Sequence, residues 1–181
     1  MTSQRADARR NRARILEAAE QILVRRGTTA STEEIARAAG VGIGTLFRHF
    51  PTKEELIRGV FEARLRRLTD EAIHLTAADD PGAALTTFLR QAVGQSEVKT
   101  ALAGMLTEAG IDIHAGDAQR ALREALSPLL ERAQNAGAVR RDLEVPELIG
   151  LLAGTSRAIE YATTPASQTR ILAVILNGLR P

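Results

Sequence analysis

The stretch STEEIARAAGVGIGTLFRHFPTKEEL, from Ser31 to Leu56, decides the fold of this chain. Ser31 followed by Glu34 has the form of a capping box, so a short helix is predicted to begin there and to end before Gly40. A second short helix is predicted from Ile43 to His49, because the residue before the following proline disfavours the helical conformation. Two short helices joined across a turn that contains glycine are typical of a helix-turn-helix motif.

The sequence on both sides of this stretch is also predicted to be helical. Upstream, apolar residues recur with helical spacing between Ala8 and Arg26, and Gly27 follows as a left-handed C-cap. Downstream, a second capping-box pattern at Thr52 opens a long helix from Lys53 to about Ala77. Further helices are predicted over 81–95, 98–109, 116–135, 146–162 and 166–179, the third of them kinked by Pro128. Because alternating β-branched segments are absent, the predicted fold class is all-α.

The outer face of the second short helix is the candidate DNA-reading surface. Helices that cross steeply need a small residue at their contact and a residue that tolerates a positive φ in the turn, and Ala36 and Gly40 stand at these positions. The small core expected between the two helices consists of Ile35, Ala39, Val41 and Leu46. The residues left on the outer face, which would enter the DNA major groove, are Gly42, Ile43, Gly44, Thr45 and Arg48.

Charge divides the chain into two parts. The whole chain has 24 Lys+Arg and 22 Asp+Glu, a net charge of +2. From Met1 to Leu68 there are 14 basic and 8 acidic residues, and from Thr69 to Pro181 there are 10 basic and 14 acidic residues. A positively charged N-terminal part and a negatively charged C-terminal part suggest that the N-terminal part binds a polyanion. We therefore predict a DNA-binding domain over residues 1–68 and a helical domain over residues 69–181.

The first residues form an Arg-rich arm in front of the predicted head. The arginines of this arm are Arg5, Arg9, Arg10, Arg12 and Arg14. Arginines ahead of a folded head can enter the adjacent minor groove, and specificity would then lean partly on them. A disordered, solvated tail is the alternative, and it is favoured for Arg5.

Several classes of protein are excluded or disfavoured by composition. With no cysteine there is no disulfide framework and no thiolate metal site, and no apolar run approaches the roughly 18 residues of a membrane span, so a cytoplasmic protein without a membrane partner is expected. GVGIGT, from Gly40, lacks the third glycine and the preceding strand of a dinucleotide site, and no nucleophile elbow is present. Glu71 and His74 have the spacing of a di-iron ligand pair but no second copy, and His114 stands alone. We expect no enzyme, no cofactor and no metal.

The helix-turn-helix stretch resembles the TetR/AcrR family of bacterial transcriptional regulators. The family pattern appears in Ile35-Ala36, Gly40-Val41, Gly44-Thr45-Leu46-Phe47, His49-Phe50 and Lys53-Glu54-Glu55-Leu56. The resemblance covers about Ile15 to Val60. It implies an all-α protein whose N-terminal three-helix head is joined by a long fourth helix to a C-terminal bundle for ligand binding and dimerisation. It also implies a homodimer that places two heads in successive major grooves of a palindromic double-stranded operator.

The same resemblance assigns DNA contacts to individual residues. Thr45 and Arg48, with Ile43, become candidates for base or backbone contact, and His49 and Lys53 become candidates for phosphate contact. Phe47 replaces the commoner tyrosine and Gly42 replaces a common hydroxyl-bearing residue, so specificity would depend on Thr45, Arg48, the arm and DNA shape. The full candidate set is Ser31, Thr32, Gly42, Ile43, Gly44, Thr45, Phe47, Arg48, His49 and Lys53.

The back half suggests a ligand site and a dimer interface. The candidate ligand-binding residues, chosen from apolar helix faces with two polar anchors, are Phe88, Met105, Leu106, Glu108, Arg157 and Tyr161. The last two helices carry apolar stripes beside Gly150 and Gly154, which would allow close approach of a second subunit. The alternatives are an ordinary core and packing within one chain.

The function predicted from these features is transcriptional regulation, most often as a repressor released from its operator by a small-molecule effector of unknown identity. A ligand would favour a state in which the two heads are wrongly spaced, acting through the long fourth helix. A constitutive or architectural dimeric DNA binder without a physiological ligand is the alternative. A helical-bundle metalloenzyme is a more distant one.

Overall fold

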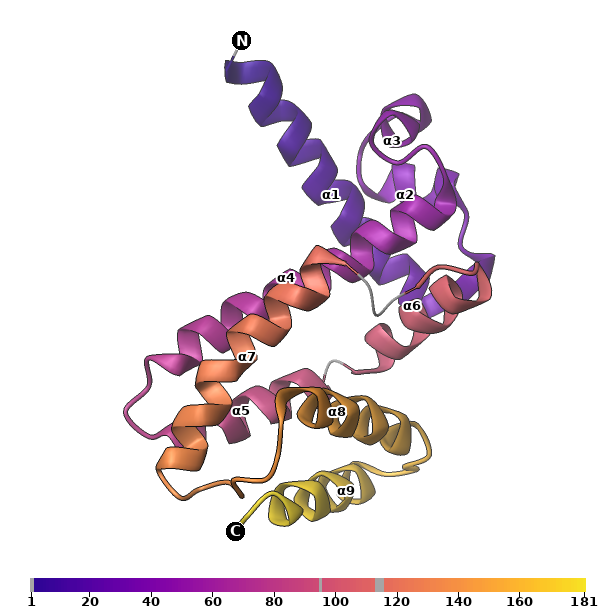
Figure 1. Cartoon of the computed structure of the whole chain (residues 1–181). Helices are drawn as coiled ribbons and strands as arrows, with labels where there is room; N and C mark the ends of the chain where they lie inside the picture. The colour runs from indigo at the N-terminus through magenta and orange to yellow at the C-terminus, as the bar shows by residue number, and fades with distance from the viewer. Residues whose placement is uncertain (1, 95, 113–115) are drawn as a thin grey trace. The chain divides into compact units, whose positions relative to one another are not determined.

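The computed structural model describes residues 2–94, 96–112 and 116–181, and within these ranges every regular element is helical (Figure 1). The elements are α1 (Thr2–Arg26), the 3-10 turn η1 (Gly27–Thr29), α2 (Thr32–Ala38), α3 (Ile43–His49), α4 (Lys53–Thr76), α5 (Pro81–Gly94), α6 (Ser96–Glu108), α7 (Asp117–Asn135), α8 (Val145–Glu160) and α9 (Pro165–Gly178). The predicted all-α fold class is confirmed. His114, the lone histidine of the back half, lies outside the described residues.

Local capping explains why the predicted helix boundaries are close to the observed ones. The Ser31 hydroxyl oxygen accepts a hydrogen bond of 3.1 Å from the backbone N–H of Glu34, and Thr52 accepts one of 3.1 Å from Glu55. Each hydroxyl satisfies a first-turn amide that has no partner within the helix. Gly27 has a φ of +55°, which is the left-handed conformation predicted for the end of α1.

The N-terminal arm is helical, which corrects the expectation of an arm or tail in front of the first helix. α1 begins at Thr2 and runs unbroken to Arg26. Its first turns contain alanine, arginine and glutamine without glycine or proline, so nothing in the sequence stops the helix from extending toward the N-terminus. Asp7 forms an ion pair with Arg10 one turn away on the same helix. The arginines of the arm therefore lie on a helix surface.

The described chain contains two compact units. The first comprises Met1–Arg64 and Ala101–His114, and the second comprises Leu65–Thr100 and Ala115–Pro181. The division after Arg64 falls near the sequence boundary proposed at Leu68, and it groups residues of α6 with the N-terminal unit. Each unit is described by itself below.

The first unit packs α1, α2 and α3 around a small apolar core. Ile15, Ile35 and Leu46 are fully buried there. The α1 and α4 helices also share a buried ion pair, in which a guanidinium nitrogen of Arg64 lies 2.5 Å from a carboxylate oxygen of Glu20. Only 5% of the Arg64 side chain is exposed, so this charge depends on its partners for solvation.

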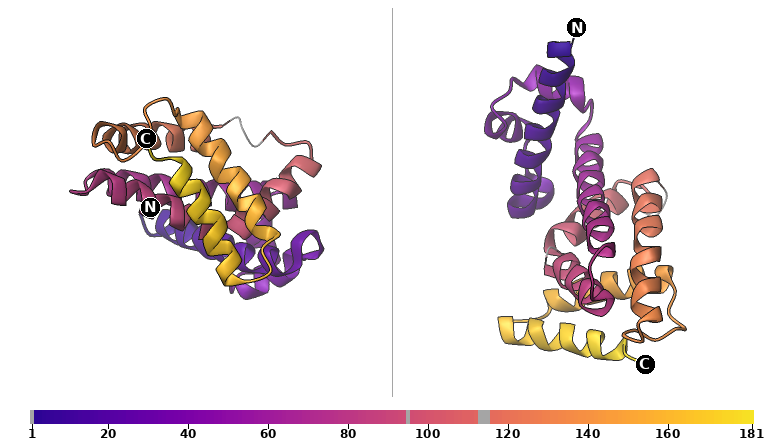
Figure 2. Two further views of the ribbon diagram at one scale, coloured as in Figure 1. Left: turned by 90° about the horizontal axis from the view of Figure 1, so that it is seen from below. Right: turned by 90° about the vertical axis from the view of Figure 1, so that its left-hand side faces the viewer.

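The second unit packs α5 against α7 and α8, and α8 against α9. Figures 1 and 2 show α8 and α9 side by side, joined by a short connection. Phe88, Leu126 and Leu148 are buried in the core of this unit. In contrast, no residue of α9 between Pro165 and Gly178 is fully buried, although the helix contains the run ILAVIL. The α9 helix therefore presents more apolar surface than its own chain covers.

The connection before α8 is fixed by polar contacts. Arg140 holds Asp142 through two hydrogen bonds of 2.6 Å, and the side chain of Gln134 donates to the carbonyl oxygens of Arg140 and Leu143. The bond to Arg140 lowers the pKa of the Asp142 carboxyl below its ordinary value.

No helix in the described ranges is long and apolar enough to cross a membrane.

Candidate nucleic-acid interface

The turn between α2 and α3 is a Schellman motif. The backbone N–H of Val41 donates to the carbonyl oxygen of Ala36 at 3.0 Å, and the N–H of Gly40 donates to Arg37 at 3.1 Å. Gly40 has a φ of +64°, a conformation that residues with a Cβ adopt at a cost. Ala36, at the contact predicted between the two helices, is buried. The local sequence thus fixes where α2 ends and in which direction the chain enters α3.

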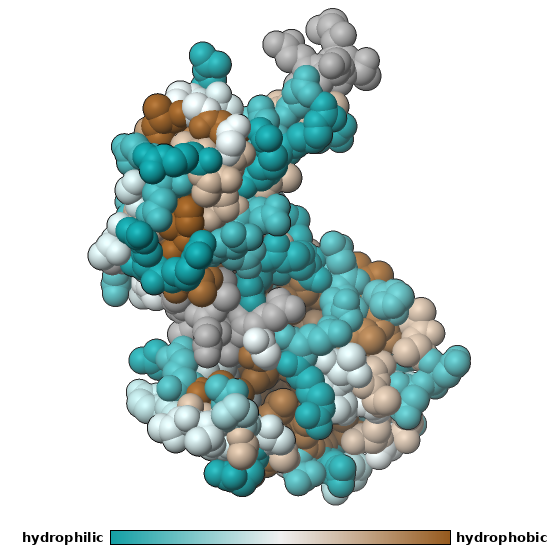
Figure 3. All heavy atoms as spheres, turned by 180° about the vertical axis from the view of Figure 1, so that it is seen from behind, coloured by the Kyte–Doolittle hydropathy of each residue, from teal (hydrophilic) through white to brown (hydrophobic). Residues whose placement is uncertain are grey.

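Burial orients α3 as the sequence predicted. Leu46 is fully buried, while Ile43 is 39% exposed and Phe47 is 41% exposed. Arg48 is exposed as well, and Thr45 is half-buried. In Figure 3 the surface of the first unit is largely hydrophilic, with hydrophobic atoms showing at a few places. The outer face of α3 therefore offers one cation, one hydroxyl and two apolar side chains to a partner.

Gly42 and Gly44 leave the backbone of this face without side chains at these two positions. A Cβ added to Gly42 or to Gly44 would have no atom within 4 Å, so neither glycine is required by packing inside the chain. Neither residue has a positive φ. Glycine in a helix costs about 0.5–1 kcal/mol relative to alanine, and Gly44 lies in the first turn of α3. Packing within the described chain therefore gives no reason for glycine at either position.

The start of α2 carries a carboxylate, that of Glu33, beside the candidate residues Ser31 and Thr32. The Glu33 carboxylate is held first by a backbone hydrogen bond at its own residue and then by the Ser31 hydroxyl, and both lower the pKa of Glu33. Thr32 also donates to this carboxylate, at 3.5 Å. A carboxylate with a lowered pKa therefore lies beside Ser31 and Thr32, two of the candidates for DNA contact. The half-buried side chains of His49 and Lys53 stay candidates for phosphate contact.

Two arginines of α1 contact the helix-turn-helix motif. The Arg12 guanidinium lies 5.0 Å from the centre of the Phe50 ring, which is buried at the end of α3. Arg14 donates to the carbonyl oxygen of Gly40 at 3.5 Å and to the side chain of Asn11 at 2.9 Å. Sequence reasoning placed both arginines in a DNA-binding arm and missed these contacts, because periodicity says nothing about which distant residue a long side chain reaches.

The α4 helix also approaches Phe50 closely. A Cβ added to Gly59 would lie 2.7 Å from Cε1 of Phe50 and 3.2 Å from a methyl carbon of Leu16. The helix can pass the ring at this distance only because residue 59 has no side chain. Sequence reasoning did not single out Gly59, although a glycine inside a predicted helix is a signal of such a contact.

The six candidate ligand-binding residues are divided between the two units. Phe88, Arg157 and Tyr161 belong to the second unit, while Met105, Leu106 and Glu108 belong to the first. Phe88, Met105 and Leu106 are buried, but Tyr161 is 76% exposed. Tyr161 was expected on an apolar helix face, but it is exposed because it is the C-cap residue of α8, beyond the last helical turn. Arg157 lies 6.0 Å above its ring and pairs with Glu160 at 2.5 Å.

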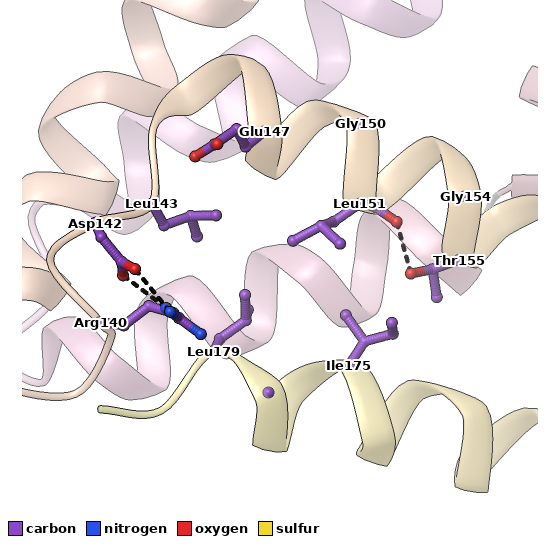
Figure 4. Close-up of a pocket in the computed structure, with 11 residues that line it drawn as sticks. Arg140, Asp142, Leu143, Glu147, Gly150, Leu151, Gly154, Thr155, Ile175 and Leu179 are labelled. Atoms are coloured by element: carbon purple, nitrogen blue, oxygen red, sulfur yellow. Dashed lines mark hydrogen bonds and ion pairs between the residues drawn. The ribbon is translucent and has the colours of Figure 1, made fainter.

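A groove of about 630 Å³ runs between α8 and α9 (Figure 4). Gly150 and Gly154 line its α8 side, and an added Cβ at either would meet nothing within 4 Å. Leu151 and Val174, on the two helices, are 37% and 69% exposed. The Arg140–Asp142 pair stands at one end of the groove, as Figure 4 shows. These are the helices for which the sequence predicted a second subunit.

A capped helix, a Schellman turn and a second helix with an exposed outer face together define a protein of the helix-turn-helix class. Comparison with known families is then specific. Residues 15–60 match the model of the bacterial regulatory proteins of the tetR family, and residues 80–181 match the model of the C-terminal domain of SbtR-like transcriptional regulators. The chain therefore belongs to the TetR family of bacterial transcriptional regulators.

Similar proteins agree with this assignment. Over 62 residues the chain is 40% identical to a helix-turn-helix transcriptional regulator of Staphylococcus aureus strain USA300, and the match spans 34% of each protein. The match thus spans about a third of the length of the curated relatives. A TetR transcription regulatory protein from Mycobacterium vanbaalenii is 40% identical, with a TM-score of 0.78, covering 98% of this chain and 99% of the other.

Two further solved structures have the same fold. The TetR regulator SCO0520 from Streptomyces coelicolor is 34% identical, with a TM-score of 0.74, covering 94% of this chain and 98% of the other. RolR, solved in complex with resorcinol, is 22% identical, with a TM-score of 0.60, covering 96% of this chain and 89% of the other. The likeness to RolR concerns the fold alone.

Proposed function

We propose that this chain is a ligand-responsive transcriptional repressor and not an enzyme. Its α3 helix enters the major groove of a palindromic operator, and two copies of the head bind one half-site each. The proposed contacts to DNA come from the outer face of α3, chiefly Thr45 and Arg48, and from the phosphate-binding candidates His49 and Lys53. A regulator of chromosomal DNA acts in the bacterial cytoplasm.

The observation that carries the proposal is the contrast between the two faces of α3. Leu46 on one face is fully buried, whereas Ile43 and Phe47 on the other are about two-fifths exposed. The side chain of Arg48, beside them, makes no hydrogen bond or ion pair with the described part of the chain. A seven-residue helix with a low, glycine-bearing surface and a free cation suits close approach to DNA.

The second copy is proposed to bind at α8 and α9. The groove between these helices, the exposed Leu151 and Val174, and the absence of fully buried residues in α9 all support this interface. Gly150 and Gly154 lie one helical turn apart and leave room for the backbone of a partner helix. A homodimer of this kind supplies the two-fold symmetry that a palindromic operator requires.

Release by a small molecule is the regulatory part of the proposal. RolR, whose fold is similar, was solved with resorcinol, so the fold accommodates a small ligand in that protein. Coupling on the order of 1–3 kcal/mol would change operator affinity roughly 5- to 150-fold. A constitutive binder is the second candidate, and the full burial of Phe88, Leu126 and Leu129 in the second unit favours it.

The DNA-binding part is tested by fluorescence anisotropy with a duplex that the wild-type protein selects from a random library. Arg48→Ala should weaken binding by about 1–3 kcal/mol, because it removes a contact from the outer face of α3. Arg123→Ala is the matched control, since Arg123 is an exposed arginine of α7 in the other unit. Equal affinities of the two variants would contradict the proposed role of α3.

A further inference from the structure

We infer that the second unit carries a binding site for a short-chain organic carboxylate, next to the groove between α8 and α9, with which it shares Leu179. The site is a pocket of about 160 Å³ bounded by α5, α9 and the segment 138–139. Two cations, Arg90 on α5 and Arg180 just after α9, line it together. The inference does not depend on the proposed DNA binding, since it concerns the second unit alone.

The charge of this pocket is uncompensated. Neither Arg90 nor Arg180 forms an ion pair or a side-chain hydrogen bond with the described residues, and no acidic residue lines the pocket. The nearby carboxylate of Asp80 is used elsewhere, because it caps α5 by accepting a hydrogen bond of 2.9 Å from the N–H of Ala83. Two guanidinium groups that face one hollow without a counter-ion favour an anion there.

The remaining lining indicates which anion. Thr86 and Asn177 add a hydroxyl and an amide that can donate hydrogen bonds. Leu89 and Leu176 supply apolar wall, so part of the bound molecule must be hydrocarbon. The volume is that of about five molecules of liquid water, well below the roughly 300–1,000 Å³ of sites for drug-sized ligands. A carboxylate with a tail of a few carbon atoms satisfies the charge, the apolar wall and the size, whereas inorganic phosphate leaves the wall unused.

The walls of the pocket are connected by local contacts. A Cβ added to Gly82, which also lines the pocket, would lie 2.7 Å from Cβ of Ala138, so α5 and this connection are in close contact at one edge. The backbone N–H of Arg140 donates to the carbonyl oxygen of Leu179 at 2.9 Å and ties the same connection to the end of α9. The three walls are therefore attached to one another beside the two arginines.

The inference is tested by isothermal titration calorimetry of the full chain with sodium butanoate at constant ionic strength, with sodium chloride and sodium phosphate in parallel. We expect saturable binding of one butanoate per chain and no comparable binding of chloride or phosphate. Arg90→Gln and Arg180→Gln should each weaken it about tenfold or more, since each removes a charge-assisted hydrogen bond. Arg123→Gln, an exposed arginine away from the pocket, should bind as the wild type does.

Three outcomes would overturn the inference. They are no saturable heat with butanoate, phosphate binding as tight as butanoate binding, and an equal loss of affinity in the Arg123→Gln control. Because Arg90 and Arg180 are exposed, their replacement should leave the fold intact, and circular dichroism of each variant verifies this. A variant that keeps wild-type helicity and full affinity would show that its arginine does not bind the anion.

Discussion

Glycine has opposite roles at two positions of the head. At Gly44 an added Cβ meets nothing within 4 Å, whereas at Gly59 it would lie 2.7 Å from the buried Phe50 ring. Both residues lie in helices and neither has a positive φ. The same substitution should therefore change the free energy of unfolding in opposite directions.

Gly44→Ala should stabilise the protein by about 0.5–1 kcal/mol, because alanine loses less backbone entropy in a helix. Gly59→Ala should destabilise it by about 1–2 kcal/mol, since overpacking against Phe50 outweighs the gain in helix propensity. Thermal unfolding of both variants checks the two signs. In anisotropy titrations Gly44→Ala should also weaken DNA binding, and an unchanged affinity would show that DNA does not approach this backbone.

At the scale of elements, the buried ion pair of Glu20 and Arg64 links α1 to α4. Glu20→Ala should lower the free energy of unfolding by roughly 3–5 kcal/mol, because it leaves a buried guanidinium without its carboxylate. Asp7→Ala, which breaks the exposed pair with Arg10 on the same α1, should cost about 0–1 kcal/mol. Urea denaturation measures both, and similar losses would mean that Arg64 is solvated by other groups.

The elements show what a sequence reveals and what it does not. The bounds of α3, Ile43 to His49, were predicted correctly because the end of this helix is set by a nearby residue, the proline at position 51. The early start of α1 was missed because the apolar stripe begins only at Ile15, while the preceding turns are polar but helix-compatible. The Glu20–Arg64 pair was missed for another reason: its members are 44 residues apart, and only the packing of α1 on α4 brings them together.

The candidate site was predictable to a similar extent. The outward face of α3 follows from helical spacing around Leu46 and agrees with the observed burial. The contacts of the Glu33 carboxylate at the start of α2 could not be foreseen, because they depend on where a flexible side chain settles. The spread of the six ligand-binding candidates over two units likewise requires a structure, since apolar faces look alike in sequence.

At the scale of the whole molecule, the uncovered apolar surface of α9 predicts a dimer. Val174→Glu should shift the protein to monomers in sedimentation velocity without loss of helicity, because it places a charge on a residue that is 69% exposed in one chain. Thr169→Glu, at an exposed polar position of α9, serves as the control and should stay dimeric. A dimeric Val174→Glu variant would place the interface elsewhere.

Sequence-specific binding of DNA by two symmetry-related α3 helices is the central prediction for this protein. The most direct measurement is to sequence the duplexes that the full-length wild-type protein enriches from a random double-stranded library. We predict an inverted repeat whose half-site centres are about 34–36 Å apart, roughly one turn of DNA, or a multiple of that distance. Enrichment of a single unrepeated site, or of no sequence at all, would contradict it.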